Sequence, residues 1–138
     1  MTLEEAMIAH LTNYAPIAGE VGKRIYGEGL MDQGSALPCI TVQRIDGRDE
    51  HQTQSGRSGT ERSRWQVNAF GARGCDAVRV ATLVVNALDG YKGMLGGAGG
   101  VKVGRCARVD RGSLGRLPDS NIFGHHVDFY VLAVEELP

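Results

Sequence analysis

Two residues near the C-terminus form the first arrangement that could do chemistry. His126 and Asp128 are two positions apart in an alternating stretch, so both side chains face the same side of a strand, whereas His125 faces the other. A histidine beside a carboxylate is part of a general-base arrangement, but no nucleophile motif accompanies this pair. We therefore interpret it as a surface pair and not as a catalytic one.

A second group of metal-ligand types is His51 with its neighbours Asp49 and Glu50. These residues fall in a long polar stretch without large apolar side chains, which is a poor support for a metal site. The fourth histidine, His10, lies off the apolar stripe of a predicted helix and is interpreted as a surface residue. No metal site is predicted.

The cysteines and one glycine-rich stretch complete the chemical candidates. Cys39, Cys75 and Cys106 are far apart and form no CxxC pair, which indicates neither zinc binding nor redox chemistry. Cys75 begins a predicted helix, where the helix dipole lowers a thiol pKa, but no histidine is close in sequence. Residues 96–100 follow a helix and precede a strand, the reverse of a phosphate loop. The sequence therefore predicts no enzyme and no cofactor.

Composition excludes further classes. The 138 residues fit one domain, 42% of them are hydrophobic, and the net charge is −1, with no basic stripe of the kind that binds nucleic acid. No apolar run approaches the roughly 18 residues that span a bilayer, and the acidic start of the chain does not resemble a signal peptide. We expect a soluble protein made in a cytoplasm, with no membrane partner and no sequence-specific nucleic-acid partner.

The elements that must position these residues follow from periodicity. Thr2 and Glu5 form a capping box that opens a helix, and Pro16 requires the helix to end by Ala15. A short segment, 17–26, is expected to be a helical turn that runs into an extended stretch. A second helix is predicted over 75–88, and strands are predicted over 37–45, 63–70, 101–111 and 122–134. The order α-β-β-α-β-β predicts an α+β two-layer sandwich, with two helices packed on one face of a mainly antiparallel sheet.

Two polar stretches separate the strands. Residues 46–62 are predicted to form a long flexible hairpin loop, because they contain too few large apolar side chains to pack into a core. Residues 112–121 are expected to be a second loop, and 94–100 a flexible connector. Mixed charges in and beside the first loop suit a polar, reversible interface with another subunit. These candidate interface residues are Arg48, Asp49, Glu50, Arg57, Glu61 and Arg62.

Several segments in this order resemble one protein family. The N-terminal helix is followed by Gly-Lys-Arg-Ile-Tyr at 22–26 and Ala-Leu-Pro-Cys-Ile-Thr-Val at 36–42, then by a strand around Trp65. Leu-Asp-Gly-Tyr-Lys-Gly at 88–93 and the closing strand at 126–131 complete the match. Over residues 3–134 the chain is similar to the tail-completion or tail-terminator proteins of siphophages, which include tail-to-head joining proteins.

The resemblance implies a function without catalysis. It implies a structural subunit of the virion that forms a hexameric ring with itself, caps the head-proximal end of the tail tube and ends its polymerisation. Its implied partners are the tail-tube protein and the head–tail connector, and its implied location is the phage tail, assembled in the host cytoplasm. The alternative from the residues alone is a small α+β ligand-binding or regulatory domain, which would need a concave apolar pocket.

Overall fold

Most of the chain is described by a computed structural model. It covers residues 2–27, 36–49, 60–97, 99–118 and 120–134, with the backbone alone at 46–49, 60, 61 and 134. The described residues form three helices and six strands. In chain order these are α1 (Leu3–Asn13), α2 (Ala15–Val21), β1 (Ile25–Tyr26), β2 (Cys39–Asp49), β3 (Thr60–Gly71), α3 (Gly74–Leu88), β4 (Gly93–Leu95), β5 (Val101–Arg116) and β6 (Phe123–Val134).

All six strands belong to one sheet with the order β1-β2-β3-β6-β5-β4. β1 runs parallel to β2, and the other neighbours are antiparallel. The prediction of an α+β fold with a mainly antiparallel sheet is confirmed, but the predicted count of two helices and four strands was too low. The sequence pattern missed β4 as a strand because three residues are too few to reveal an alternation.

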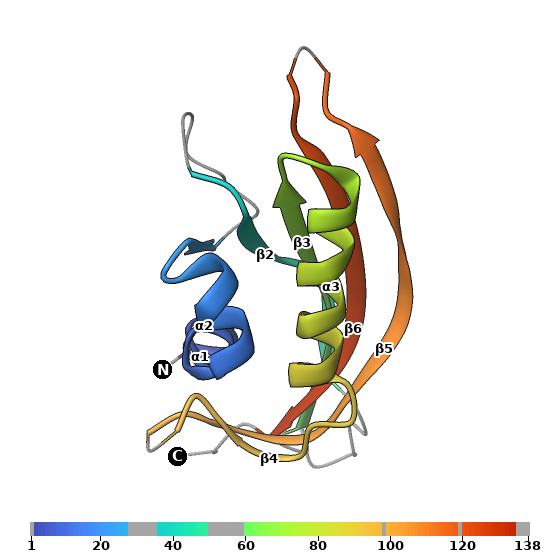
Figure 1. Ribbon diagram of the computed structural model, residues 1–138. Helices are drawn as coiled ribbons and strands as arrows, with labels where there is room; N and C mark the ends of the chain where they lie inside the picture. The colour runs from blue at the N-terminus through green and yellow to red at the C-terminus, as the bar shows by residue number, and fades with distance from the viewer. Residues whose placement is uncertain (1, 28–35, 50–59, 98, 119, 135–138) are drawn as a thin grey trace.

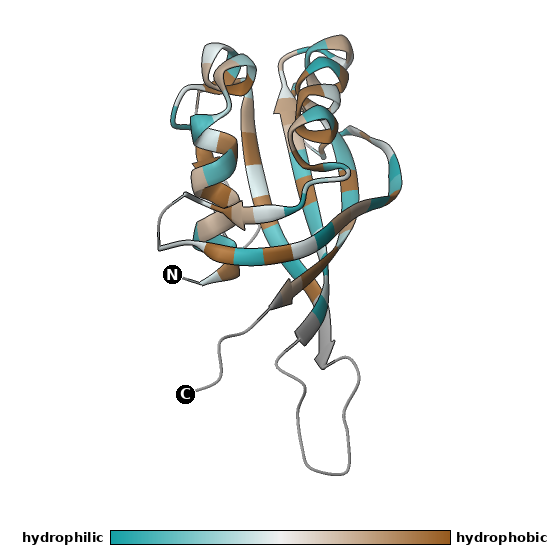
Figure 2. Cartoon of the chain, turned by 90° about the horizontal axis from the view of Figure 1, so that it is seen from below, coloured by the Kyte–Doolittle hydropathy of each residue, from teal (hydrophilic) through white to brown (hydrophobic). Residues whose placement is uncertain are grey.

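The sheet is a strongly curled half-barrel, not the flat layer of a simple sandwich, and the helices lie inside its curve (Figure 1). Both edge strands, β1 and β4, contact α1, although they stand at opposite ends of the strand order. β2 has one register shift and β5 has three, and bulges of this kind bend a strand and increase its twist. Figure 2 shows the long strands curving beneath the helices.

Alternation along β3 and β6 builds the core. Val127, Phe129 and Val131 of β6 are buried on the face that α3 covers, as are Trp65 and Val67 of β3. The helices pack against this face with apolar residues that recur at helical spacing. Their fully buried members include Met7, Leu11, Val80, Val84 and Leu88. These strands and helices therefore share one core, with Leu3 packed against it and only partly buried.

The termini of the helices agree with local rules. The predicted capping box at Thr2 and Glu5 is present, and α1 ends at Asn13, before Pro16. α2 and β1 fulfil the expectation of a helical turn leading to an extended stretch. Gly90, with φ +78°, adopts the left-handed conformation just beyond α3 that a glycine tolerates best.

Three strands, β2, β3 and β5, extend beyond the ends that the sequence pattern predicts. Of the predicted loop 46–62, residues 46–49 continue β2 and residues 60–62 begin β3, whereas 50–59 lie outside the described residues. β5 also continues past Gly112 to Arg116. The reason is tertiary: β6 pairs with β3 and β5 along its whole length, so backbone hydrogen bonds hold polar residues in strands.

The alternation of β5 is interrupted beside Arg105. β5 changes register between Val103 and Arg105, and the buried residue that follows is Cys106, not Ala107. Val109, which the simple alternation placed on the packed face, is 47% exposed because of these shifts. A single extra residue moves every later side chain to the other face.

Candidate assembly surfaces

The outer edge of β5 is covered over its first half only. β4 pairs with residues 101–103, the turn after α3 exchanges backbone hydrogen bonds with Cys106, and the carboxylate of Asp89 accepts from the Arg108 amide at 2.9 Å. From residue 109 to 116, no described strand pairs with this edge. Over these eight residues, the backbone donors and acceptors that point away from β6 face no other described strand, so a further strand can pair there.

Side chains along this open edge suit a protein partner. Val109 and Leu114 are 47% and 42% exposed, and both belong to the small set of large apolar residues that the described chain leaves exposed. Arg108 and Arg116 are exposed beside them. Apolar contact area flanked by arginines is a common composition of protein interfaces.

The opposite corner of the sheet has a second open edge. β1 pairs with β2 only at Ile40 and Thr41, so the outer edge of β2 has no described strand partner from residue 43 to 49. Ile45, beside the β2 bulge, is 48% exposed. The two open edges are different surfaces at opposite corners, because β2 leads to residues 50–59 and β5 to the turn at 117–122.

The predicted interface residues lie at the end of the β2–β3 hairpin. Arg48 and Asp49 are on β2 and Glu61 is on β3, with only their backbone described, while Glu50 and Arg57 lie outside the described residues, as does His51. Arg62 is exposed on β3, and its guanidinium lies 4.0 Å from the ring centroid of Tyr130. The pairing Asp49–Glu61 places the charged positions of both strands at one corner.

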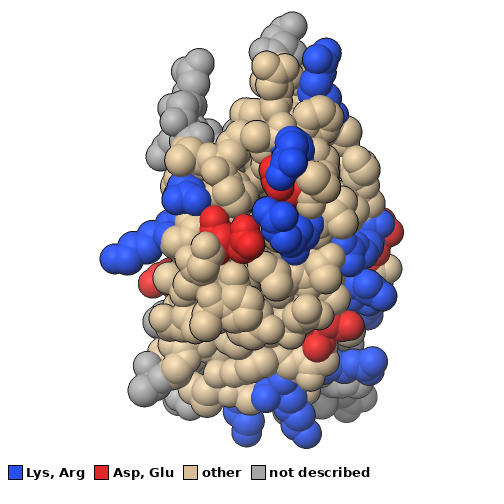
Figure 3. All heavy atoms as spheres, in the orientation of Figure 1, with Lys and Arg blue, Asp and Glu red and all other residues tan. Residues whose placement is uncertain are grey.

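Charges of both signs are interspersed over the face that carries the helices (Figure 3). One network is centred on Asp76 in the first turn of α3, which binds Arg73 and Arg79 at 3.1 Å each. The hydrogen bond from Arg73 is the main cause that lowers the pKa of Asp76. Mixed charge of this kind favours reversible contact with proteins over a broad electrostatic attraction to nucleic acid.

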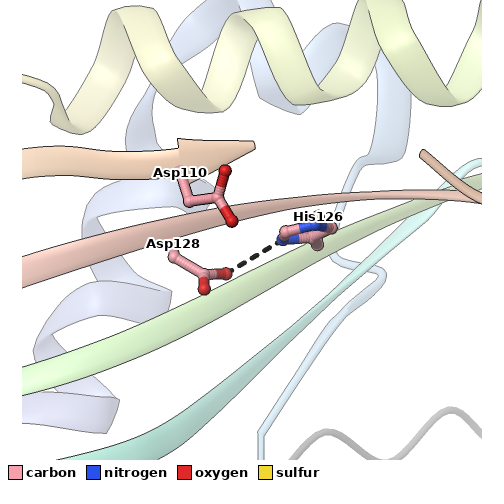
Figure 4. A group of neighbouring side chains, drawn as sticks. All are labelled: Asp110, His126 and Asp128. Atoms are coloured by element: carbon pink, nitrogen blue, oxygen red, sulfur yellow. Dashed lines mark hydrogen bonds and ion pairs between the residues drawn. The ribbon is translucent and has the colours of Figure 1, made fainter. Parts of the chain in front are cut away.

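His126 and Asp128 form a pair on the face of the sheet turned away from the helices, but the interpretation as a surface pair was wrong for Asp128, which is only 5% exposed. Nδ1 of His126 donates to Oδ1 of Asp128 at 3.0 Å, and Arg64 of β3 binds Oδ2 at 2.7 Å. Asp110 of β5 completes the only described group of metal-ligand side chains (Figure 4). The pattern of His126 and Asp128 was visible in the sequence, but Arg64 and Asp110 were not, because strand register alone brings them here.

The remaining chemical candidates have structural positions. Cys39 and Cys106 are buried, and burial raises the pKa of these thiols to about 11 and about 12. The interpretation of His10 as a surface residue was wrong: its Nε2 donates to the Ala87 carbonyl at 2.9 Å, which ties α1 to the end of α3. Of the described helices, none is long and apolar enough to cross a membrane.

The fold combines a curled sheet, helices inside its curve and open strand edges. Residues 5–133 match the family model of the tail completion protein gp17. The chain belongs to this family, which confirms that it is a structural component of a phage tail and not an enzyme.

A solved structure supports the fold independently. The chain is similar to one from a structure described as the virion of a native gene transfer agent particle, with a TM-score of 0.71 and 16% sequence identity. The match covers 96% of this chain and 94% of that one, so the curled sheet and its helices are shared as a whole. No curated protein matches this sequence.

Proposed function

We propose that the chain acts as a single tail-terminator domain that forms a six-membered ring on the head-proximal end of the tail tube. The ring ends tube polymerisation and presents a surface to the head–tail connector. Its partners are therefore further copies of itself, the tail-tube protein and the connector protein. Family membership favours this role over the alternative of a ligand-binding or regulatory domain.

The observation that carries the proposal is the pair of different open edges. A ring of identical subunits uses heterologous contacts, in which one surface meets a different surface of the neighbour. The edge of β5 at 109–116 and the edge of β2 at 43–49 are two such surfaces of one sheet. The number six comes from the family resemblance and not from these edges.

The experiment compares assembly of matched lysine variants. Val109→Lys and Leu114→Lys place charge on the open β5 edge, and Val78→Lys is the control, because Val78 is similarly exposed at 44% but lies on α3. Light scattering and electron microscopy, with the protein alone and with tail tubes, should show rings for the wild type and the control and fewer rings for the edge variants. Equal assembly of all four proteins would overturn the role of this edge.

The hairpin corner is the second proposed contact, carried by Arg48, Asp49, Glu50, Arg57, Glu61 and Arg62. Because 46–49 and 60–62 are strand residues, the deletion that tests the loop alone removes 50–59 and inserts a short Gly-Ser turn. The β2–β3 pairing should survive, whereas capping of tail tubes should fail. Tubes of normal length, joined normally to heads, would show that the loop is dispensable.

A further inference from the structure

The outer face of the sheet holds a group of side chains that the assembly role does not use. Asp110 on β5 and His126 and Asp128 on β6 each offer one ligand atom, and these atoms lie within 4.8 Å of one another (Figure 4). Asp110 and Asp128 are direct partners across the antiparallel pair. Like charges at such positions destabilise a sheet, so this arrangement calls for a cation.

Within the described residues, cationic side chains neutralise only one of the two carboxylates. Arg64 binds Oδ2 of Asp128, while Asp110 has no ion-pair partner within the described residues. With a neutral histidine, two carboxylates and one guanidinium leave the group with an excess negative charge. We propose that Asp110, His126 and Asp128 form a binding site for a divalent transition-metal ion, with Zn²⁺ as the best match.

Ligand geometry supports zinc. Zinc bonds to nitrogen and oxygen of roughly 2.0–2.2 Å at a tetrahedral angle separate two ligand atoms by about 3.3 Å. Nδ1 of His126 and Oδ1 of Asp128 are already 3.0 Å apart, so an ion can take the place of the proton between them, and the neutral imidazole then carries its proton on Nε2. A nitrogen ligand and only three protein ligands disfavour Ca²⁺ and Mg²⁺, which take more oxygen ligands.

The surroundings hold the ligands in place. Asp128 is only 5% exposed, and Arg64 fixes its Oδ2 while leaving Oδ1 for an ion. Gly112 pairs with His126 across β5 and β6, and a Cβ at Gly112 would lie 3.1 Å from Nε2 of the histidine, so glycine makes room for the ring.

The chain itself gives the ion three ligands, so a water would fill the fourth coordination position of a bound zinc.

Metal titration of the untagged full-length protein tests the site. Calorimetry with ZnCl₂ should give saturable binding of one ion per chain, and Co²⁺ should give visible absorption bands of a low-coordinate nitrogen and oxygen site. His126→Ala and Asp110→Asn should each weaken binding by about tenfold or more. Circular dichroism confirms that the variants fold, which is expected for Asp110→Asn because Asp110 is exposed.

Three control variants separate this site from other sources of binding. Glu20→Gln removes the same charge elsewhere, Cys75→Ser removes the exposed thiol, and His51→Ala removes a histidine outside the described residues. Each should bind zinc as the wild type does. The proposal is overturned if the wild type shows no saturable binding, if His126→Ala and Asp110→Asn leave binding unchanged, or if a control variant abolishes it.

Discussion

The two faces of β6 differ in what they do for the protein. Val127, Phe129 and Val131 point toward the helices and are at most 1% exposed, whereas His126 and Asp128 point away and form hydrogen bonds and ion pairs. One strand thus serves the core and a polar cluster at the same time, because successive side chains alternate between faces. The fold therefore depends on the core face of β6, and the opposite face is available for binding.

The sharpest test of this difference replaces each of two neighbouring aromatic residues of β6 by alanine, one residue on each face. Phe129→Ala should lower the free energy of unfolding by about 3–5 kcal/mol, because it empties a fully buried site in the core. Tyr130→Ala, on the opposite face, should cost roughly 1 kcal/mol, mainly through its contact with the Arg62 guanidinium. Urea denaturation measures both variants. Similar losses for the two would show that the faces are not distinct.

The polar face of β6 is expected to contribute less to the free energy of unfolding than the face that packs against the helices. Arg64→Met leaves the carboxylate of Asp128 with His126 as its remaining partner. The loss of stability should be clearly smaller than that of Phe129→Ala and below that of breaking a fully buried pair, because the Arg64 side chain is 34% exposed to solvent. A double variant that also carries Asp128→Asn should recover part of the loss. If it does not, the two side chains are not coupled.

A pH titration distinguishes the faces through His125, whose ring lies on the helical side of β6. Burial is the main cause that lowers the pKa of His125, and the positive charge of Arg111 lowers it further. As the pH falls, the unfolded chain binds the His125 proton at a higher pH than the folded chain does. The free energy of unfolding should therefore fall as the pH drops from 6.5, the ordinary pKa of histidine, toward the lowered pKa of His125. His125→Asn should flatten this slope, which thermal unfolding between pH 7 and 5 measures. An unchanged slope would assign it to another group.

The smallest effect on folding is expected at the open edge of β5. Val109→Lys and Leu114→Lys alter side chains that are 47% and 42% exposed, so each should change stability by no more than about 0.5 kcal/mol. The same variants should reduce ring formation, as argued above. A large loss of stability would mean that this edge is part of the folded core and not a free surface.

Local sequence alone determined much of the fold. The capping box at Thr2, the stop before Pro16, the stripe of α3 and the alternation of β6 each depend on residues close in the chain, and each is present. The order of segments also identified the family, although no single segment is specific. Such features need no knowledge of distant contacts, because propensity, capping and periodicity act over a few residues.

Only the tertiary structure decided the rest. β4 and the extensions of β2, β3 and β5 exist because a neighbouring strand satisfies their backbone groups, and their own side chains carry little signal. The bulges of β5 set which of its residues face outward, and so place Asp110 opposite Asp128 and leave Val109 on an open edge. The curl of the sheet and both proposed surfaces follow from the register of the strands. Strand pairing fixes this register, and the residue pattern of a single strand does not specify it.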